Sequence, residues 1–313
     1  MSLSMTWTGV MPAITTPFTA DGDVDHAFLA RHALWMVDAG CIGIVALGSL
    51  GEAATLSVSE KLEVLRTLAR ALDGRVPLVA GIAALSTDEA CGLAHAAAGI
   101  GCAGLMVLPP YVYSTDWREM RAHVSAVIAA TALPCMLYNN PIAYRTDFRP
   151  EQVEELALAH DNLVAVKESS ADIRRIAAIR HRLGDRLAIL VGVDDLIVEG
   201  IAAGATGWVA GLVNAMPAES VRLFELAVRA QSPDAGTAAS ARAAADALYA
   251  WFLPLLTLDT VPKFVQLIKL VQQQVGHGHE RVRAPRLVLD GAEREQTLAL
   301  IAAKLATRPG NVA

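Results

Sequence analysis

The sequence predicts an α/β fold in which eight parallel strands, each followed by a helix, close into a (β/α)8 barrel (a TIM barrel) with a C-terminal helical appendage. The 313 residues are about twice a ~150-residue domain, which suits one large barrel or two smaller domains. Apolar residues make up 54% of the chain, enough for a large core. Eight short apolar runs alternate with helical segments, and eight such units favour a closed barrel over a doubly wound sheet.

The apolar runs are the predicted strands. They begin near Val10, Ile42, Pro77, Gly104, Pro134, Leu163, Leu187 and Thr206. Runs such as 76–82 and 187–191 are apolar throughout instead of alternating with polar residues. Strands of this kind have both faces buried, as in a parallel sheet that helices cover.

The segments between the runs show helical periodicity, for example at 57–72 and 115–130. Ser57 and Glu60 have the spacing of a capping box, which predicts a helix start at Ser57. No strand pattern follows Val213, and the helical segments there are 215–230, 238–257, 260–275 and 292–306. We therefore predict a barrel over residues 1–230 and a C-terminal helical extension over residues 231–313.

Composition argues against several classes of function. The net charge is −6 and no cluster of Lys and Arg exceeds a pair, so we expect no nucleic-acid partner. No run reaches the ~18 apolar residues of a membrane span, and we expect no signal peptide. Four widely spaced cysteines are typical of reduced core cysteines in a cytoplasmic protein: Cys41, Cys91, Cys102 and Cys135. The glycine motifs of dinucleotide and P-loop sites do not occur.

The active site of a (β/α)8 barrel lies at the C-terminal ends of its strands. Polar residues follow five of the predicted strands, in the segments Gly48–Glu52, Pro109–Tyr111, Tyr138–Pro141, Lys167–Ser169 and Gly192–Asp195. These segments together are the candidate site.

Lys167 is the residue that most directly indicates a reaction. It follows the apolar run 163–166 and is expected to project from a buried strand into the barrel mouth. Burial disfavours the charged form of an amine, and a free amine attacks a ketone to form a Schiff base. Such an imine promotes C–C cleavage or elimination without a metal or an organic cofactor. The alternative is a structural lysine paired with a carboxylate of Glu168, Asp194 or Asp195.

Tyr138 ends the strand that precedes Lys167. Neighbouring strands lie ~4.8 Å apart, so the Tyr138 phenol is expected to reach the Lys167 amine and to move protons during imine formation. The alternative is a tyrosine that only fills the top of the barrel. Tyr111 and Ser49 are candidates for a relay of hydroxyl groups toward solvent.

Two other motifs have a functional and a structural interpretation. The turn 48–51 is expected to bring backbone N–H groups to a substrate carboxylate, and its alternative is a plain tight turn. His277, His279 and Glu280 could ligate a metal, but their place in a glycine-rich loop far from the strand ends favours an exposed loop.

Together these residues resemble the dihydrodipicolinate synthase / N-acetylneuraminate lyase family of class I Schiff-base lyases, over nearly the whole chain. The resemblance rests on the turn Gly48–Glu52, on Pro-Pro-Tyr at 109–111, on Tyr-Asn-Asn-Pro at 138–141 and on the strand end Lys167-Glu168. The spacing of 29 residues between Tyr138 and Lys167 also agrees.

The resemblance implies that Lys167 is the Schiff-base lysine and Tyr138 the acid/base, with Ser49 and Tyr111 as relay hydroxyls. It implies a 2-oxo or 2-imino acid as the small-molecule substrate, no metal, no cofactor besides the covalent lysine imine, and a homotetramer. The substrate-binding residues that it implies are Gly48, Leu50, Asn140, Arg145, Gly192 and Val209.

Two departures from the family pattern bear on the substrate. Leu50 stands where many members have a hydroxyl-bearing threonine, and Arg145 follows its Tyr-Asn-x-Pro motif at a longer spacing than the synthase's arginine. The segments 139–145, 167–175 and 280–286 are most similar to a catabolic branch that includes 1-pyrroline-4-hydroxy-2-carboxylate deaminases. Deamination and dehydration of that compound is therefore the first hypothesis.

Other activities stay open. Within the family they are a 4-hydroxy-tetrahydrodipicolinate synthase, which condenses pyruvate with aspartate semialdehyde, and a pyruvate-dependent 2-oxo-acid aldolase. A sugar-phosphate isomerase is disfavoured because the acidic segment 192–195 would repel phosphate. A non-catalytic relative is disfavoured because both Lys167 and Tyr138 are present.

Overall fold

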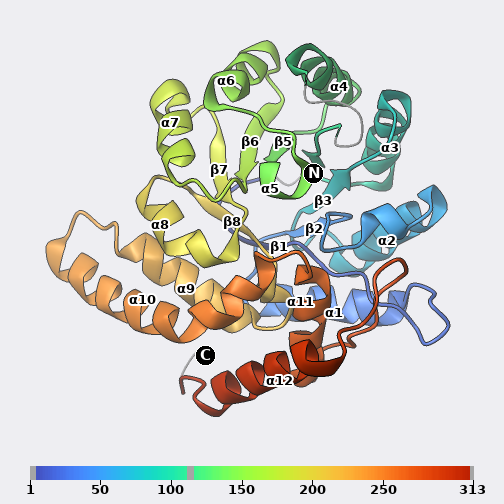
Figure 1. The fold of residues 1–313 in the computed structure, drawn as a ribbon. Coiled ribbons are helices and arrows are strands. Elements are labelled where there is room, and N and C mark those ends of the chain that lie inside the picture. The colour runs from blue at the N-terminus through green and yellow to red at the C-terminus, as the bar shows by residue number, and fades with distance from the viewer. Residues whose placement is uncertain (1–4, 111–115, 311–313) are drawn as a thin grey trace.

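The structure is a computed structural model that describes residues 5–110 and 116–310 (Figure 1). The strands in these residues are β1 (Gly9–Pro12), β2 (Ile44–Ala46), β3 (Leu78–Ile82), β4 (Gly104–Val107), β5 (Cys135–Asn139), β6 (Leu163–Glu168), β7 (Ala188–Val191) and β8 (Gly207–Ala210). All pairings are parallel, in the order β1-β8-β7-β6-β5-β4-β3-β2. A parallel bridge between Ala13 and Val45 joins β1 to β2 and closes the barrel.

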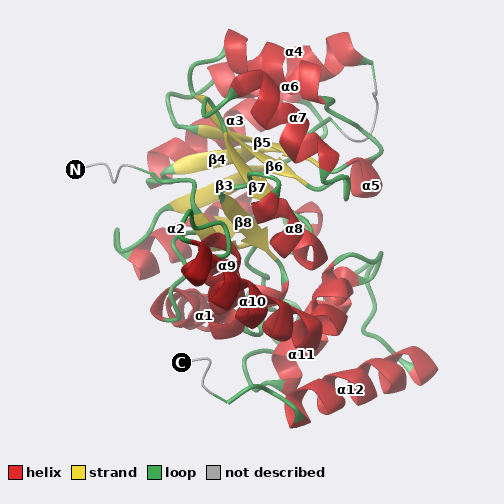
Figure 2. Cartoon of the chain, turned by 90° about the vertical axis from the view of Figure 1, so that its left-hand side faces the viewer, coloured by secondary structure: helices red, strands yellow, loops and turns green. Residues whose placement is uncertain are grey.

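Helices surround this barrel, as the fold prediction requires. They are α1 (His26–Asp38), α2 (Val58–Leu72), α3 (Thr87–Ile100), α4 (Trp117–Ala129), α6 (Pro150–Ala159), α7 (Arg174–Leu183), α8 (Ile197–Ala202) and α9 (Pro217–Arg229). The short α5 (Pro141–Tyr144) follows β5 directly and lies at one end of the barrel (Figure 2). All eight predicted strands are present, and the barrel prediction is confirmed.

Helix starts follow local capping chemistry. Ser57 Oγ accepts a hydrogen bond from the Glu60 N–H and the Glu60 carboxylate accepts one from the Ser57 N–H, so the predicted capping box is present. The helix expected from 238 begins at Ala235 because Asp234 accepts from the Thr237 N–H at 2.8 Å.

The C-terminal extension contains α10 (Ala235–Leu256), the 3-10 turn η4 (Thr257–Asp259), α11 (Phe264–Gln274) and α12 (Gly291–Ala306). The helix expected from 260 begins only at Phe264, because Pro262 lacks an N–H and restricts the residue before it. The three helices lie together beside α1 and α9, to one side of the barrel (Figures 1 and 2). The predicted boundary at residue 230 falls between α9 and α10, and the division into two domains stays a prediction.

The core is one continuous apolar cluster that includes the barrel interior and the faces of α10 and α11 that pack on it. The four cysteines are unpaired, and burial raises the pKa of Cys41, Cys102 and Cys135 to about 12. In the described part of the chain, no helix is both long and apolar enough to span a membrane.

Candidate active site

Lys167 and Tyr138 lie side by side at the end of the barrel. The parallel register pairs Tyr138 of β5 with Lys167 of β6, which places both side chains at the same level. Both are nearly buried, with 4% of Tyr138 and 6% of Lys167 exposed. The Lys167 Nζ lies 4.3 Å from the centre of the Tyr138 ring. The two residues with the strongest chemical indication in the sequence are therefore in contact.

Lys167 is not a structural ion-pair lysine. Among the described residues, no carboxylate lies within 4.0 Å of its amine. The Glu168 carboxylate instead accepts hydrogen bonds from Asn139 Nδ2 at 3.0 Å and from the Ser170 N–H at 2.7 Å. Burial raises the pKa of Glu168. Successive side chains of a strand point to opposite faces of the sheet. Glu168 therefore connects the ends of β5 and β6 through its hydrogen bond with Asn139, while Lys167 points to the opposite face.

The Tyr138 hydroxyl is held in place by Asn140. Asn140 Nδ2 donates to it at 2.9 Å, while Asn140 Oδ1 accepts from the Ala143 N–H and caps α5. Asn140 was expected to bind substrate. Its contacts here position the phenol of Tyr138 instead, and its role toward substrate stays a prediction.

Tyr144 is a functional candidate that sequence reasoning missed. Its hydroxyl is hydrogen-bonded to Ser49 Oγ, and its ring packs edge-on against Tyr138 with 5.8 Å between ring centres. The one-turn helix α5, with Pro141 at its first position, returns Tyr144 over the barrel end. The Asn-Pro pair was the available signal for that turn. Tyr111, the other predicted relay hydroxyl, lies outside the described residues.

The turn after β2 presents unused backbone donors. Among the residues that the structure describes, none accepts a hydrogen bond from the N–H groups of Ser49 and Leu50. Leu47 and Glu52 flank the turn with left-handed φ angles of 62° and 53°, a conformation that non-glycine residues adopt at a cost in energy. The turn from Gly48 to Gly51 is thus a strained loop with two N–H groups that donate to none of the described residues.

A buried ion pair holds this turn from behind. The Glu52 carboxylate contacts the Lys269 ammonium of α11, and its second oxygen accepts from the Arg283 N–H at 3.1 Å. Burial lowers the pKa of Lys269 to about 8, although the Glu52 charge acts in the opposite direction. Lys269 also donates to the carbonyl of Thr16 at 2.8 Å. The C-terminal extension therefore supports the turn.

Gly192 follows β7 and packs directly on Lys167. A Cβ at Gly192 would lie 2.6 Å from Lys167 Cε and 1.9 Å from Ser169 Oγ, so no larger residue fits without movement. Val209 of β8 is fully buried in the barrel wall. Both residues lie at the barrel end, and their contact with substrate stays a prediction.

Two aspartates lie on the β7 and β8 side of the barrel mouth. Asp194 is fully buried and accepts from Trp208 Nε1 at 2.9 Å, from the Gly211 N–H at 3.0 Å and from the Leu212 N–H at 2.7 Å. Burial raises the pKa of Asp194 to about 6, against the effect of these donors and of Lys167. Burial and the Asp194 charge raise the pKa of Asp259, which reaches this region from η4.

Other predicted features lie elsewhere or serve packing. Arg145 is exposed at the C-terminal end of α5. His277 stacks on Trp35 with 3.8 Å between ring centres, and Glu280 pairs with Arg294 at 2.9 Å, so the loop 277–280 is not arranged as a metal site. No group of three His, Cys, Asp or Glu residues in the described ranges is placed to hold a metal ion.

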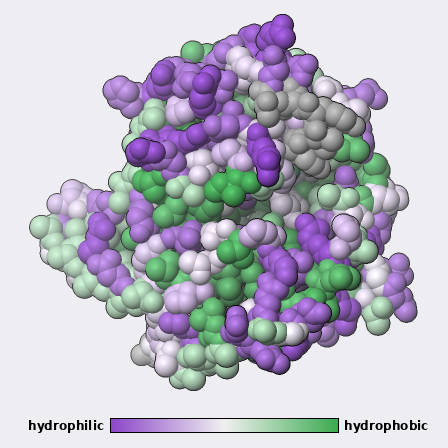
Figure 3. Space-filling model, in the orientation of Figure 1, coloured by the Kyte–Doolittle hydropathy of each residue, from purple (hydrophilic) through white to green (hydrophobic). Residues whose placement is uncertain are grey.

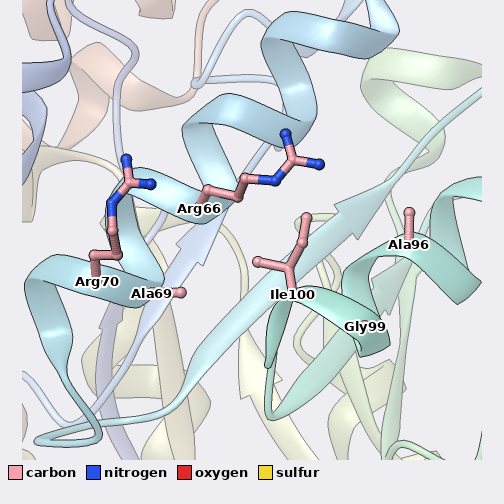
Figure 4. Close-up of a pocket in the computed structure, with 6 residues that line it drawn as sticks. All are labelled: Arg66, Ala69, Arg70, Ala96, Gly99 and Ile100. Atoms are coloured by element: carbon pink, nitrogen blue, oxygen red, sulfur yellow. The ribbon is translucent and has the colours of Figure 1, made fainter.

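Figure 3 gives the face of Figure 1, on which hydrophobic residues gather near the centre and hydrophilic residues dominate the upper edge. A separate groove lies on the outside of the barrel between α2 and α3 (Figure 4). It is lined by Arg66, Ala69, Arg70, Ala96, Gly99 and Ile100. None of these is a predicted site residue.

The barrel and the contact of Lys167 with Tyr138 agree with the fold and the residue pair expected of a Schiff-base lyase. Comparison with known proteins gives the family. The model of the dihydrodipicolinate synthetase family matches residues 6–304. The chain therefore belongs to this family, whose members are lyases that form a Schiff base on a lysine.

Individual relatives agree with the family model. A 4-hydroxy-tetrahydrodipicolinate synthase of Sorangium cellulosum is 34% identical over 92% of this chain and 93% of its own length. The crystal structure of a putative dihydrodipicolinate synthetase from Pseudomonas aeruginosa is 29% identical, with a TM-score of 0.87 over 96% of this chain and all of that one. A prophage protein from E. coli K12, solved with pyruvate, is 25% identical, with a TM-score of 0.86 over 96% of this chain and 99% of that one.

Proposed function

We propose that this enzyme binds a 2-oxo or 2-imino acid covalently through Lys167, with Tyr138 as the proton-transfer group and without a cofactor. The observation that carries the proposal is the contact between a nearly buried lysine and a nearly buried tyrosine on neighbouring strands, 4.3 Å from amine to ring centre. The lysine has no carboxylate within ion-pair distance among the described residues, so its amine is open to attack a carbonyl.

The proposed reaction begins when Lys167 Nζ attacks C2 of the acid. From a 2-oxo acid the carbonyl oxygen leaves C2 as water after Tyr138 supplies a proton; from a 2-imino acid the imine nitrogen leaves C2 as an amine that has taken up the proton. In both cases an imine to Lys167 remains. Loss of a proton from C3 turns the imine into an enamine. Its electron pair then either forms a bond to an aldehyde carbon or expels a hydroxyl group from C4. The free N–H groups of Ser49 and Leu50 are suited to hold the C1 carboxylate throughout.

Condensation of the enamine with an aldehyde, a reaction of two substrates, is the first candidate. The Sorangium relative is named 4-hydroxy-tetrahydrodipicolinate synthase, and the E. coli relative was solved with pyruvate. These names favour pyruvate as the first substrate and aspartate semialdehyde as the acceptor. They support this reaction, or a related pyruvate-dependent aldol reaction, better than the deaminase hypothesis, because none of the relatives reported above carries a deaminase name.

Elimination from a single acid such as 1-pyrroline-4-hydroxy-2-carboxylate is the second candidate. Two residues favour it: Leu50 supplies no hydroxyl at the carboxylate turn, and Arg145 is exposed at the end of α5. A side-by-side comparison of kcat/KM on both substrate systems separates the two. A tenfold advantage, ~1.4 kcal/mol of transition-state preference, for the lysine-pathway pair would reject the second candidate.

The covalent step has a direct test. Borohydride with pyruvate or a related 2-oxo acid should inactivate the enzyme and leave one adduct on the peptide that contains Lys167. Lys167→Met should abolish the adduct. Lys61→Met is the matched control, because Lys61 is also a buried lysine but lies on α2, outside the barrel. An adduct on another lysine would refute the mechanism. Analytical ultracentrifugation tests the homotetramer, which we propose as the assembly.

A further inference from the structure

The two N–H groups of the turn after β2 are aimed by hydrogen bonds to the peptide units that carry them. The N–H of Leu50 shares a peptide plane with the Ser49 carbonyl, which accepts from the Glu52 N–H at 3.1 Å. The N–H of Ser49 shares a plane with the Gly48 carbonyl, which accepts from the Ala53 N–H at 3.4 Å. Because N–H and C=O point in opposite directions across a trans peptide, both N–H groups are directed away from the segment that donates to the carbonyls.

The backbone of Glu52 holds these directions in a strained conformation. Its φ of 53° lies in the left-handed region, and such a conformation persists only where the surrounding contacts fix it. The Glu52 carboxylate supplies these contacts, since the residue is 1% exposed and pairs with the Lys269 ammonium and the Arg283 N–H. The Arg286 guanidinium is 3.9 Å from the same carboxylate, too far for a hydrogen bond. Loss of the pair with Lys269 would therefore let Glu52 relax and turn both peptide units.

Lys269 of α11 reaches the turn by two routes. Its ammonium has three N–H donors, and they bind the Glu52 carboxylate, the Thr16 carbonyl at 2.8 Å and the Arg281 carbonyl at 2.9 Å. The Thr16 hydroxyl in turn donates to the Gly51 carbonyl at 2.6 Å. One lysine thus fixes the Glu52 side chain and, through Thr16, the last carbonyl of the turn. Its three donors are used on protein groups, so it acts on a ligand only through its neighbours.

We propose that Lys269 is a positioning residue of the C-terminal extension that sets the affinity of the enzyme for the carboxylate of its substrate. This rests on the proposed function, in which the N–H groups of Ser49 and Leu50 hold the C1 carboxylate. Loss of Lys269 turns these N–H groups but leaves the reacting pair of lysine and tyrosine in place. Hydrogen bonds to a carboxylate are roughly twice as strong as those to a neutral acceptor, so the effect is largest for substrates that carry the charge.

The experiment compares pyruvate with pyruvamide, in which a neutral amide replaces the carboxylate. The concentration that gives half-maximal borohydride trapping on Lys167, and the trapping rate at saturation, are measured for each compound with the full-length enzyme. The first variant is Lys269→Met, which keeps the length of the side chain. The double variant Glu52→Gln/Lys269→Met removes both charges of the pair and covers the case in which the single variant fails to fold. Arg308→Met is the matched control, because it also removes the partner of a buried barrel carboxylate, that of Glu219 on α9.

The wild type and Arg308→Met should prefer pyruvate by at least about tenfold, the effect of one hydrogen bond to a charged group. Lys269→Met and the double variant should need about tenfold more pyruvate but less than about threefold more pyruvamide, with a saturated trapping rate within about threefold of the wild type. An equal rise for both compounds would give Lys269 a general structural role and overturn the positioning role alone, as would an unchanged pyruvate concentration in both variants. A wild type without a preference, or without a pyruvate adduct on Lys167, would overturn the proposed function and the positioning role with it.

Discussion

Replacement of Gly192 by alanine is a sharp test of the site, because the added methyl group would press on the proposed Schiff-base lysine, Lys167. The added Cβ would lie 2.6 Å from Lys167 Cε, whereas ordinary contact begins at 3.4 Å, so the lysine must retreat by about 0.8 Å. Ser169 Oγ, at 1.9 Å, must move further. A displacement of this size at a reacting group costs on the order of 100-fold in rate, or ~2.7 kcal/mol. Overpacking should cost a further ~1–3 kcal/mol of folding free energy.

The assay is the rate of borohydride trapping of pyruvate on Lys167, together with urea unfolding. Gly99→Ala in α3 is the control, because nothing lies within 4 Å of its added Cβ. A second variant combines Gly192→Ala with Ser169→Gly, which removes the clash with the serine but keeps the clash with Lys167. Its trapping rate should therefore stay as low as that of Gly192→Ala. If Gly192→Ala trapped pyruvate within threefold of the wild type, the geometry derived for Lys167 would be wrong.

Three further predictions concern other parts of the molecule. Tyr138→Phe keeps the ring over Lys167 and removes the hydroxyl, so kcat should fall ~10²–10⁴-fold; a loss below threefold would make Tyr138 a filler of the barrel top. Tyr144→Phe should slow imine formation by less than Tyr138→Phe and leave the unfolding free energy nearly unchanged, and a larger loss than that of Tyr138→Phe would contradict a secondary relay role. Burial lowers the pKa of His32 to about 4, so the unfolded chain binds a proton that the folded chain excludes between pH 6.5 and pH 4. Stability should therefore fall by about 3 kcal/mol as pH decreases through this window. His32→Gln should lose this pH dependence, which urea unfolding at pH 7 and pH 4.5 measures. An equal change in unfolding free energy between the two pH values in the wild type and in His32→Gln would refute the prediction.

The barrel and the central pair could be predicted because their signals are local. Each strand is a short apolar run, and the position of Lys167 after such a run is enough to place it at the mouth. The register that pairs it with Tyr138 follows from the rule that neighbouring parallel strands end at the same edge. These features depend on a few consecutive residues, so the sequence contains them directly.

Tyr144 and Asp259 were missed because their roles depend on distant parts of the chain. Tyr144 contacts Ser49 across 95 residues, and nothing in the sequence around either residue specifies the contact. The sequence indicates Asp194 and Asp195 as partners of Lys167 or as groups that repel phosphate, whereas the effect of Asp194 on Asp259 arises from a turn 65 residues later. The motif at 138–141 predicts that Asn140 binds substrate, which stays a prediction; its hydrogen bond to Tyr138 is not indicated by the motif.

The extension contributes to the site and is more than an added layer. Lys269 of α11 pairs with Glu52, which directly follows the turn 48–51. Loss of one partner of a buried ion pair typically costs ~3–5 kcal/mol of folding free energy. Asp259 lies over Gly211 at the end of β8. Both contacts run from residues beyond 230 into loops of the barrel mouth. Because the Glu52–Lys269 pair supports the turn whose Ser49 and Leu50 N–H groups are proposed to hold the substrate carboxylate, removal of the extension would weaken that turn as well as the packing outside the barrel.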